Sequence, residues 1–168
     1  SESCAFSIIG GEIERELGPG EMVIIDKRGM RYEQAVTAGR SAHCLFEFIY
    51  FARPDSRMSD NTIYTVREKM GAALYGEHPV EADIVIPVPD SGVPAAHGYA
   101  AAAKLPFVEG MIKNRYVQRT FIQPTQELRE QGVRMKLSAV SSVVKGKRVV
   151  MIDDSIVRGT TLKNSIIR

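Results

Sequence analysis

Two adjacent carboxylates and a pair of threonines lie close together near the end of the chain. Asp153 and Asp154 follow four apolar residues, and a short turn containing Gly159 then leads to Thr160 and Thr161. A helix that begins at these threonines would present free backbone N–H groups and positive potential, so this turn is suited to hold a phosphate. The two carboxylates suit a polyol or a metal ion. Together they predict a site for a ribose 5-phosphate.

The residues around these carboxylates follow a recognisable order. Residues 149–161 read VVMIDDSIVRGTT, and they resemble the phosphoribosyl pyrophosphate (PRPP) motif of type I phosphoribosyltransferases. The alternative is an ordinary strand, turn and helix whose acidic residues only cap the helix. A cap needs one acidic residue and not the whole series of residue types, so we favour the phosphate site.

Strand and helix patterns alternate through the second half of the chain. We expect buried strands at 83–88, 107–108 and 147–152, the last of them covered on both faces. Apolar residues at helical spacing predict a helix over 63–74 that Gly76 would end, and an alanine-rich stretch predicts a helix over 93–104. This alternation predicts an α/β fold with a parallel sheet flanked by helices.

A second polar turn, PVPDSG at 87–92, follows the strand expected at 83–88. Ligands of such sheets bind beyond the carboxyl ends of the strands, so Asp90 and Ser91 would face the same crevice as Asp153 and Asp154. A long charged segment, 113–134, lies between the two turns and shows no sustained strand period. A solvated loop with a short helix after Pro124 is one interpretation. Its five cations beside a polyphosphate site favour a lid.

The first forty residues have a different character. Strand-like runs at 5–9 and 22–25, with turn residues between and after them, predict hairpin strands. Residues 34–40 are polar and suit a crossing between two units. A chain that opens in the middle of a β pattern without a start methionine is expected to be the tail of a larger domain. The aromatic stretch 43–56 is expected to deliver Phe46, Phe48, Tyr50 and Phe51 to a core.

Composition limits the possible partners and compartment. The chain has 168 residues, 44% of them hydrophobic and 25% charged, and a formal net charge of +2. This near-neutral charge gives no reason to expect nucleic acid or an acidic membrane as a partner, and no apolar run approaches the roughly 20 residues that span a bilayer. The two cysteines, Cys4 and Cys44, are too few for a disulfide framework, which fits a reducing cytoplasm.

Several segments together are similar to those of the glutamine phosphoribosylpyrophosphate amidotransferase family. These segments are FEFIYFARPDS, PVPDSG, IKNRYVQRTFIQP, LREQGVRMKLS and VVMIDDSIVRGTT. The resemblance implies the first committed step of purine synthesis, in which ammonia from glutamine joins PRPP to give phosphoribosylamine, diphosphate and glutamate. It implies that residues 1–38 are the end of an N-terminal nucleophile glutaminase domain and that 39–168 begin a phosphoribosyltransferase domain. The chain would then be a fragment, inactive when isolated.

The resemblance also implies a role for each polar residue. Asp153 and Asp154 would be catalytic, hold the ribose hydroxyls directly or through magnesium, and oppose the developing cation, with Ser91 sharing the metal. The other substrate-binding residues are Asp90, Ser91, Lys113, Arg115 and Arg119 at the diphosphate, and Ser155, Arg158, Gly159, Thr160 and Thr161 at the 5-phosphate.

Some members of this family hold a structural [4Fe–4S] cluster, and Cys44 stands where one of its cysteines would lie. The alternative is a free buried cysteine among Leu45, Phe46 and Phe48. The resemblance further implies a homo-oligomer that uses PRPP and glutamine-derived ammonia. Two other functions stay open: a phosphoribosyltransferase for a free base, and a regulatory module that senses PRPP without catalysis.

Overall fold

The computed structural model describes residues 2–37, 39, 42–116 and 137–156. Its first elements are helix α1 (Cys4–Ile8) and the strands β1 (Glu21–Asp26) and β2 (Gly29–Gln34), which form an antiparallel hairpin. The hairpin confirms the strand expected at 22–25. The strand expected at 5–9 is wrong: this short run pairs with no strand among the described residues and satisfies its backbone N–H groups within helix α1 and the turn after it.

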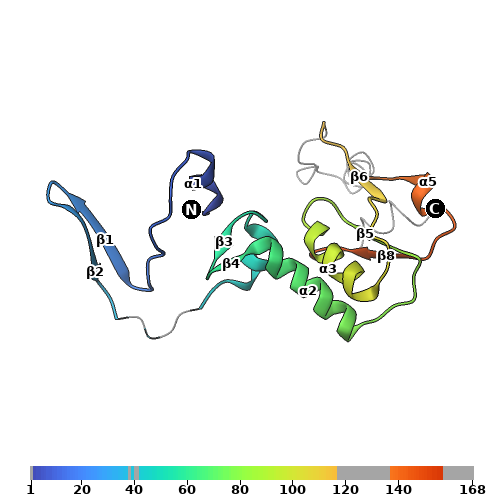
Figure 1. Cartoon of the computed structure of the whole chain (residues 1–168), viewed down its shortest axis with the longest axis horizontal. Helices are drawn as coiled ribbons and strands as arrows, with labels where there is room; N and C mark the ends of the chain where they lie inside the picture. The colour runs from blue at the N-terminus through green and yellow to red at the C-terminus, as the bar shows by residue number, and fades with distance from the viewer. Residues whose placement is uncertain (1, 38, 40–41, 117–136, 157–168) are drawn as a thin grey trace, which may run out of the picture.

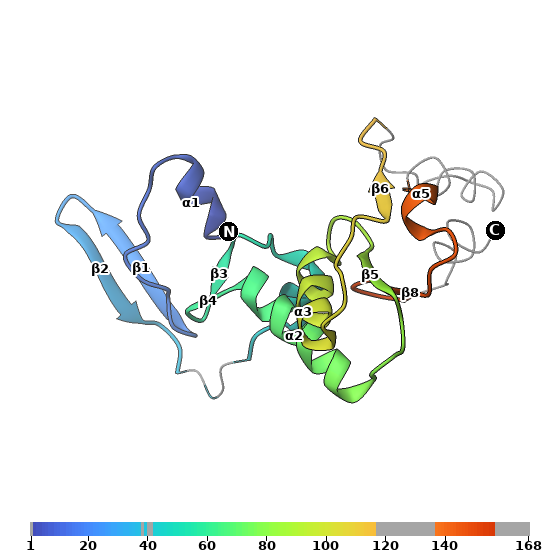
Figure 2. The ribbon, with the colours of Figure 1, turned by 45° about the vertical axis from the view of Figure 1, so that its right-hand side comes forward.

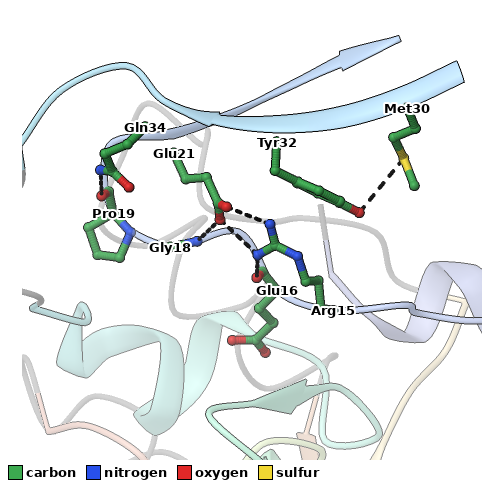
Figure 3. Close-up of polar contacts among 8 residues, drawn as sticks. All are labelled: Arg15, Glu16, Gly18, Pro19, Glu21, Met30, Tyr32 and Gln34. Carbon is green, nitrogen blue, oxygen red and sulfur yellow. Dashed lines mark hydrogen bonds and ion pairs between the residues drawn. The ribbon is translucent and has the colours of Figure 1, made fainter. Parts of the chain in front are cut away.

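An arginine fastens the coil before β1 to the hairpin (Figure 3). The Arg15 guanidinium donates a hydrogen bond of 2.8 Å to Glu21 Oε2 and lies 3.7 Å from the centre of the Tyr32 ring. The Gly18 N–H donates to the same carboxylate at 2.9 Å. These contacts, the one to Arg15 above all, lower the pKa of Glu21 to about 2. The Glu21 carboxylate is therefore ionised beside Arg15 at neutral pH.

The aromatic stretch forms η1 (Glu47–Phe51), a short π-helix, and the short strands β3 (Arg57–Met58) and β4 (Asn61–Thr62) follow it as an antiparallel pair. The expectation that its aromatic side chains enter a core is wrong for Phe46, Tyr50 and Phe51, of which 57%, 42% and 59% of the surface is exposed. Only Phe48 among the four is half-buried. One face of η1 packs on the following helix, so side chains on the other faces point to solvent.

Helices α2 (Ile63–Glu77) and α3 (Val93–Ala103) lie side by side (Figures 1 and 2). Both were predicted, but Gly76 does not end α2: the helix continues to Glu77, and the backbone N–H of its C-cap His78 donates to the Leu74 carbonyl oxygen. The helices approach closely at two glycines. A Cβ atom at Gly71 would lie 1.8 Å from the Ala95 carbonyl oxygen, and one at Gly98 would lie 1.8 Å from the Glu68 carbonyl oxygen.

The central strands are β5 (Ile84–Pro87) and β8 (Val149–Ile152), which pair in parallel as predicted. Phe107 adds a single parallel bridge to Val85, at the place where a third strand was expected. Strand β5 is completely buried, whereas only Ile152 of β8 is. The expectation that β8 is covered on both faces is therefore wrong in the described part of the chain, where β8 pairs with β5 alone.

The core joins α3 to these two strands. Its buried residues are Val85, Ala96, Tyr99, Ala100 and Ile152. A further antiparallel pair, β6 (Met111–Lys113) and β7 (Leu137–Ala139), precedes the short helix α5 (Ser141–Val144). None of the described helices is long and apolar enough to cross a membrane.

Candidate functional site

The parallel pairing of β5 and β8 brings the two predicted polar turns to one edge of the sheet. Pro87 is opposite Ile152 at the ends of the two strands. One residue further, the Val88 N–H donates to the Ile152 carbonyl oxygen at 2.8 Å. The turn that carries Asp90 and the acidic pair, Asp153 and Asp154, therefore leave the sheet at the same edge.

A glycine makes this close arrangement possible. Gly92 follows the first turn, and a Cβ atom on it would lie 2.5 Å from the Ile152 carbonyl oxygen and 2.9 Å from the Val88 carbonyl oxygen. Its φ of −73° is accessible to any residue, so space and not backbone conformation requires glycine here. A side chain at this position would push the two strand ends apart.

The acidic pair is partly organised by its own backbone. The Asp154 N–H donates to Asp153 Oδ1 at 2.9 Å, and the Ser155 hydroxyl donates to Asp154 Oδ1 at 2.6 Å. Desolvation by the surrounding protein raises the pKa of Asp153, the neighbouring Asp154 charge adds to this rise, and the Asp154 N–H opposes it. The protein thus leaves negative charge here for which a bound cation could compensate.

On the other turn, Asp90 forms an ion pair with Lys113 at the end of β6. The Asp90 side chain is 72% exposed and that of Lys113 is 34% exposed, and such surface pairs add little to stability. The ion pair instead places a cation beside the turn. The Pro89–Asp90 peptide bond in this turn is cis.

A hollow of about 450 Å³ opens next to Lys113. Arg115, the second predicted cation, also lines this hollow, and the Tyr116 N–H donates to Asn114 Oδ1 at 3.0 Å beside it. The complete lining is Ile112, Lys113, Asn114, Arg115, Tyr116 and Ser138.

Seven of the twelve residues predicted for the PRPP site can be placed. Asp90, Ser91, Asp153, Asp154 and Ser155 lie at or next to the sheet edge, and Lys113 and Arg115 lie beside it. The remaining predicted residues, Arg119, Arg158, Gly159, Thr160 and Thr161, lie outside the described residues, as does most of the segment expected to be a lid.

The sequence analysis missed Arg67, which is buried in α2 with 3% of its surface exposed. Its side chain donates to the carbonyl oxygens of Phe48 and Ala52, at 2.8 Å each. A signal was present, because Arg67 lies four residues after Ile63 and four before Gly71, on the apolar face of the predicted helix.

Comparison with known families decides the class of the fold. The model of the phosphoribosyl transferase domain family matches residues 62–166. The chain belongs to the phosphoribosyltransferase family. The predicted α/β phosphoribosyltransferase fold is thereby confirmed, and the match includes both turns of the sheet edge.

Individual relatives extend the similarity to the N-terminal residues. The chain is 54% identical to the amidophosphoribosyltransferase of Methanothermobacter thermautotrophicus over 162 residues, 96% of this chain and 34% of the relative. It is also 54% identical to that of Bacillus subtilis over 166 residues, 99% of this chain and 35% of the relative. The chain thus spans about a third of the length of these curated relatives.

A solved structure agrees with this similarity. The glutamine PRPP amidotransferase from B. subtilis, complexed with ADP and GMP, superposes with a TM-score of 0.87 at 54% identity. The superposition covers 99% of this chain and 36% of that one. These comparisons confirm the resemblance to amidophosphoribosyltransferases that the sequence segments indicated.

Proposed function

We propose that this chain is part of an amidophosphoribosyltransferase, which makes 5-phosphoribosylamine, glutamate and diphosphate from PRPP, glutamine and water. One observation carries the proposal: similarity to these enzymes covers 96% or more of the chain, including the hairpin before the phosphoribosyltransferase domain. A phosphoribosyltransferase for a free base would have no reason to share that hairpin. Residues 1–38 are then the end of a glutaminase domain, and 39–168 begin the transferase domain.

The acidic pair has the most direct role in this proposal. Diphosphate leaves C1 of the ribose while positive charge develops on the ring, and ammonia is already a nucleophile. The site therefore needs charge stabilisation more than a strong base. Asp153 and Asp154 hold the ribose hydroxyls and oppose the ring charge, which is favoured by their position at the carboxyl end of β8.

The remaining predicted residues bind the two ends of PRPP. Lys113 is the described cation closest to the diphosphate turn, since it already pairs with Asp90. A diphosphate would offer Lys113 more negative charge than one carboxylate does. The full set is Asp90, Ser91, Lys113, Arg115 and Arg119 at the diphosphate, and Ser155, Arg158, Gly159, Thr160 and Thr161 at the 5-phosphate.

The donors at the sheet edge fit magnesium. Ser91, Asp153 and Asp154 offer hard oxygen ligands, and the raised pKa of Asp153 indicates negative charge that the protein does not fully compensate. Magnesium, when bound, would neutralise phosphate charge next to these residues. Magnesium usually binds through one or two carboxylates together with waters and substrate phosphates, and two adjacent carboxylates fit that pattern.

The reaction itself tests the proposal in the full-length protein. We expect glutamate and diphosphate to appear in equal amounts when PRPP and glutamine are supplied, and diphosphate alone to appear with ammonia. Diphosphate release that requires a purine or pyrimidine base would instead establish the free-base alternative. Binding of PRPP without release under any of these conditions would support a sensor. We further propose a cytoplasmic homo-oligomer, and the two free cysteines fit that compartment.

Replacing Lys113 by Met in the full-length protein is expected to raise the KM for PRPP by about 10- to 100-fold. Loss of a charge-assisted hydrogen bond costs about 1.5–3 kcal/mol. Initial rates at varied PRPP concentration measure this, with exposed Lys145→Met as the control. A KM that is the same in both variants would remove Lys113 from the diphosphate site.

Cys44 is exposed, which contradicts the alternative of a buried cysteine, and Cys4 is buried. A [4Fe–4S] cluster needs four thiolates, so the two cysteines of this chain do not fit such a cluster by themselves. In full-length protein prepared without oxygen, we expect Cys44→Ser to remove bound iron and sulfide, and Cys4→Ser to retain them. Iron-free wild-type protein with full activity would rule out ligation by Cys44.

A further inference from the structure

The buried Arg67 has carbonyl oxygens as its partners instead of a carboxylate. Its Nε donates to Phe48 O at 2.8 Å, and its Nη2 donates to Ala52 O at 2.8 Å and to Glu47 O at 3.4 Å. No carboxylate among the described residues forms an ion pair with it. Because a buried charge is costly without compensation, these carbonyl oxygens, from the first two residues of η1 and from its C-cap Ala52, must be held firmly against α2.

The start of the chain also holds this part of the protein. Glu2 Oε2 accepts hydrogen bonds from the Arg53 N–H at 2.6 Å and from the Ser56 hydroxyl at 2.7 Å. Ser3 Oγ accepts one from the Arg57 N–H at 2.6 Å. Ser56 is 1% exposed, so at least one of these contacts is shielded from water. We call residues 47–57 the clamped segment.

The clamped segment also caps the N-terminus of α2. The N–H groups of Ile63 and Tyr64, its first two residues, donate to Ser56 O at 2.9 Å and to Pro54 O at 2.8 Å. The first N–H groups of a helix have no partner within the helix, so these carbonyl oxygens cap it. A shift of the clamped segment would therefore move the start of α2, which packs tightly on α3.

Helix α3, on which α2 packs, connects the clamped segment with the sheet edge. Its N-cap residue Gly92 donates to the Val88 carbonyl oxygen at 3.1 Å, and a Cβ atom on Gly92 would lie 2.5 Å from the Ile152 carbonyl oxygen.

Desolvation lowers the pKa of Arg67, and the negative charges of Asp154 and Glu2 oppose that change. Both carboxylates therefore favour the charged form of the Arg67 guanidinium. Under the proposed function, Arg67 belongs to the transferase domain and Glu2 to the glutaminase domain.

We propose that Arg67 and Glu2 are positioning residues that together fix the clamped segment, and through α2 and α3 the sheet edge that carries the acidic pair, so that loss of the Glu2 contacts slows the transferase reaction. The proposal rests on the proposed function. Glu2 would then act between domains, because it belongs to the end of the glutaminase domain and its partners Arg53 and Ser56 belong to the transferase domain. Because small misplacement of a group that acts in the transition state is costly, the effect is expected in kcat more than in the KM for PRPP.

The test uses the ammonia-dependent reaction of the full-length protein, far below the unfolding temperature of every variant. We expect Glu2→Ala and Arg67→Lys each to lower kcat about tenfold. In the double variant, the fold-reduction in kcat should be smaller than the product of the two single reductions. Glu2→Gln, which keeps an acceptor oxygen, should recover part of the loss. Glu14→Ala, at an exposed position in the same segment, should match the wild type.

Two results would overturn the inference. A lower unfolding temperature for Glu2→Ala with unchanged kcat would show that the Glu2 contacts are purely structural. Reductions in kcat that simply multiply in the double variant would show that Glu2 and Arg67 act independently. If Arg67→Lys does not fold, the Glu2 variants still decide the matter. Wild-type protein that releases no diphosphate from PRPP and ammonia would refute the proposed function, and this inference with it.

Discussion

Replacing Asp153 or Asp154 by Asn in the full-length protein is expected to lower kcat about a hundredfold, a typical cost of removing one group that stabilises transition-state charge. The KM for PRPP should rise much less, because the carboxylate charge matters most when the ribose ring is cationic. Diphosphate release with saturating PRPP and ammonia measures both parameters. The ammonia-dependent reaction needs no hydrolysis of glutamine, so a loss in these variants can be assigned to the transferase half-reaction.

A suitable control for these variants is Asp60→Asn. Asp60 is an exposed residue in the β3–β4 turn with a φ of +64°, a conformation that asparagine adopts as readily as aspartate. This substitution also removes one negative charge, but at a position remote in sequence from the acidic pair, and it should leave kcat unchanged. Full turnover in both Asp153→Asn and Asp154→Asn would remove the acidic pair from catalysis.

Replacing Gly98 by Ala is expected to destabilise the protein by about 3 kcal/mol, at the upper end of the usual cost of overpacking. The added Cβ atom would lie 1.8 Å from the Glu68 carbonyl oxygen and 2.7 Å from its carbon. These are backbone atoms of α2, so they cannot rotate away as a side chain can. Relief requires α2 and α3 to separate, which exposes the apolar surface between them.

Gly76→Ala provides the matched control within α2. A Cβ atom at Gly76 meets nothing within 4 Å, and alanine favours a helix over glycine by about 0.5–1 kcal/mol. Denaturant unfolding should therefore show a lower midpoint for Gly98→Ala and an equal or higher one for Gly76→Ala, with unchanged slopes. Equal midpoints for both variants would mean that the contact between α2 and α3 is loose.

These two glycines show where sequence patterns stop being informative. Helical spacing of apolar residues placed α2, and an alanine-rich stretch placed α3, within a few residues of their observed bounds, because a helix repeats over many positions. Nothing in either pattern distinguishes Gly76, which is free to change, from Gly71 and Gly98, which are not. The difference lies in the carbonyl oxygens of the neighbouring helix, and these are remote in sequence.

The prediction that the aromatic stretch enters a core was wrong for a related reason. Residue type predicts burial only on average, and the exposure of Phe46, Tyr50 and Phe51 depends on which face of η1 meets α2. Arg67 is the converse case, since a charged residue is buried because three carbonyl oxygens converge on it. Both outcomes follow from tertiary contacts that alternation of polar and apolar residues does not encode.

The sequence by itself determined the α/β class, the parallel pairing of the two central strands and the phosphoribosyltransferase resemblance, because local periodicity and short motifs carry that information. It also placed Asp90 and Asp153 at one edge, since parallel strands end on the same side. Only the tertiary structure decided that Lys113 pairs with Asp90, that Gly92 leaves room between the strand ends, and that Glu2 and Arg67 hold one segment. Each of these contacts joins residues from separate elements, and their meeting depends on how helices and strands pack in space.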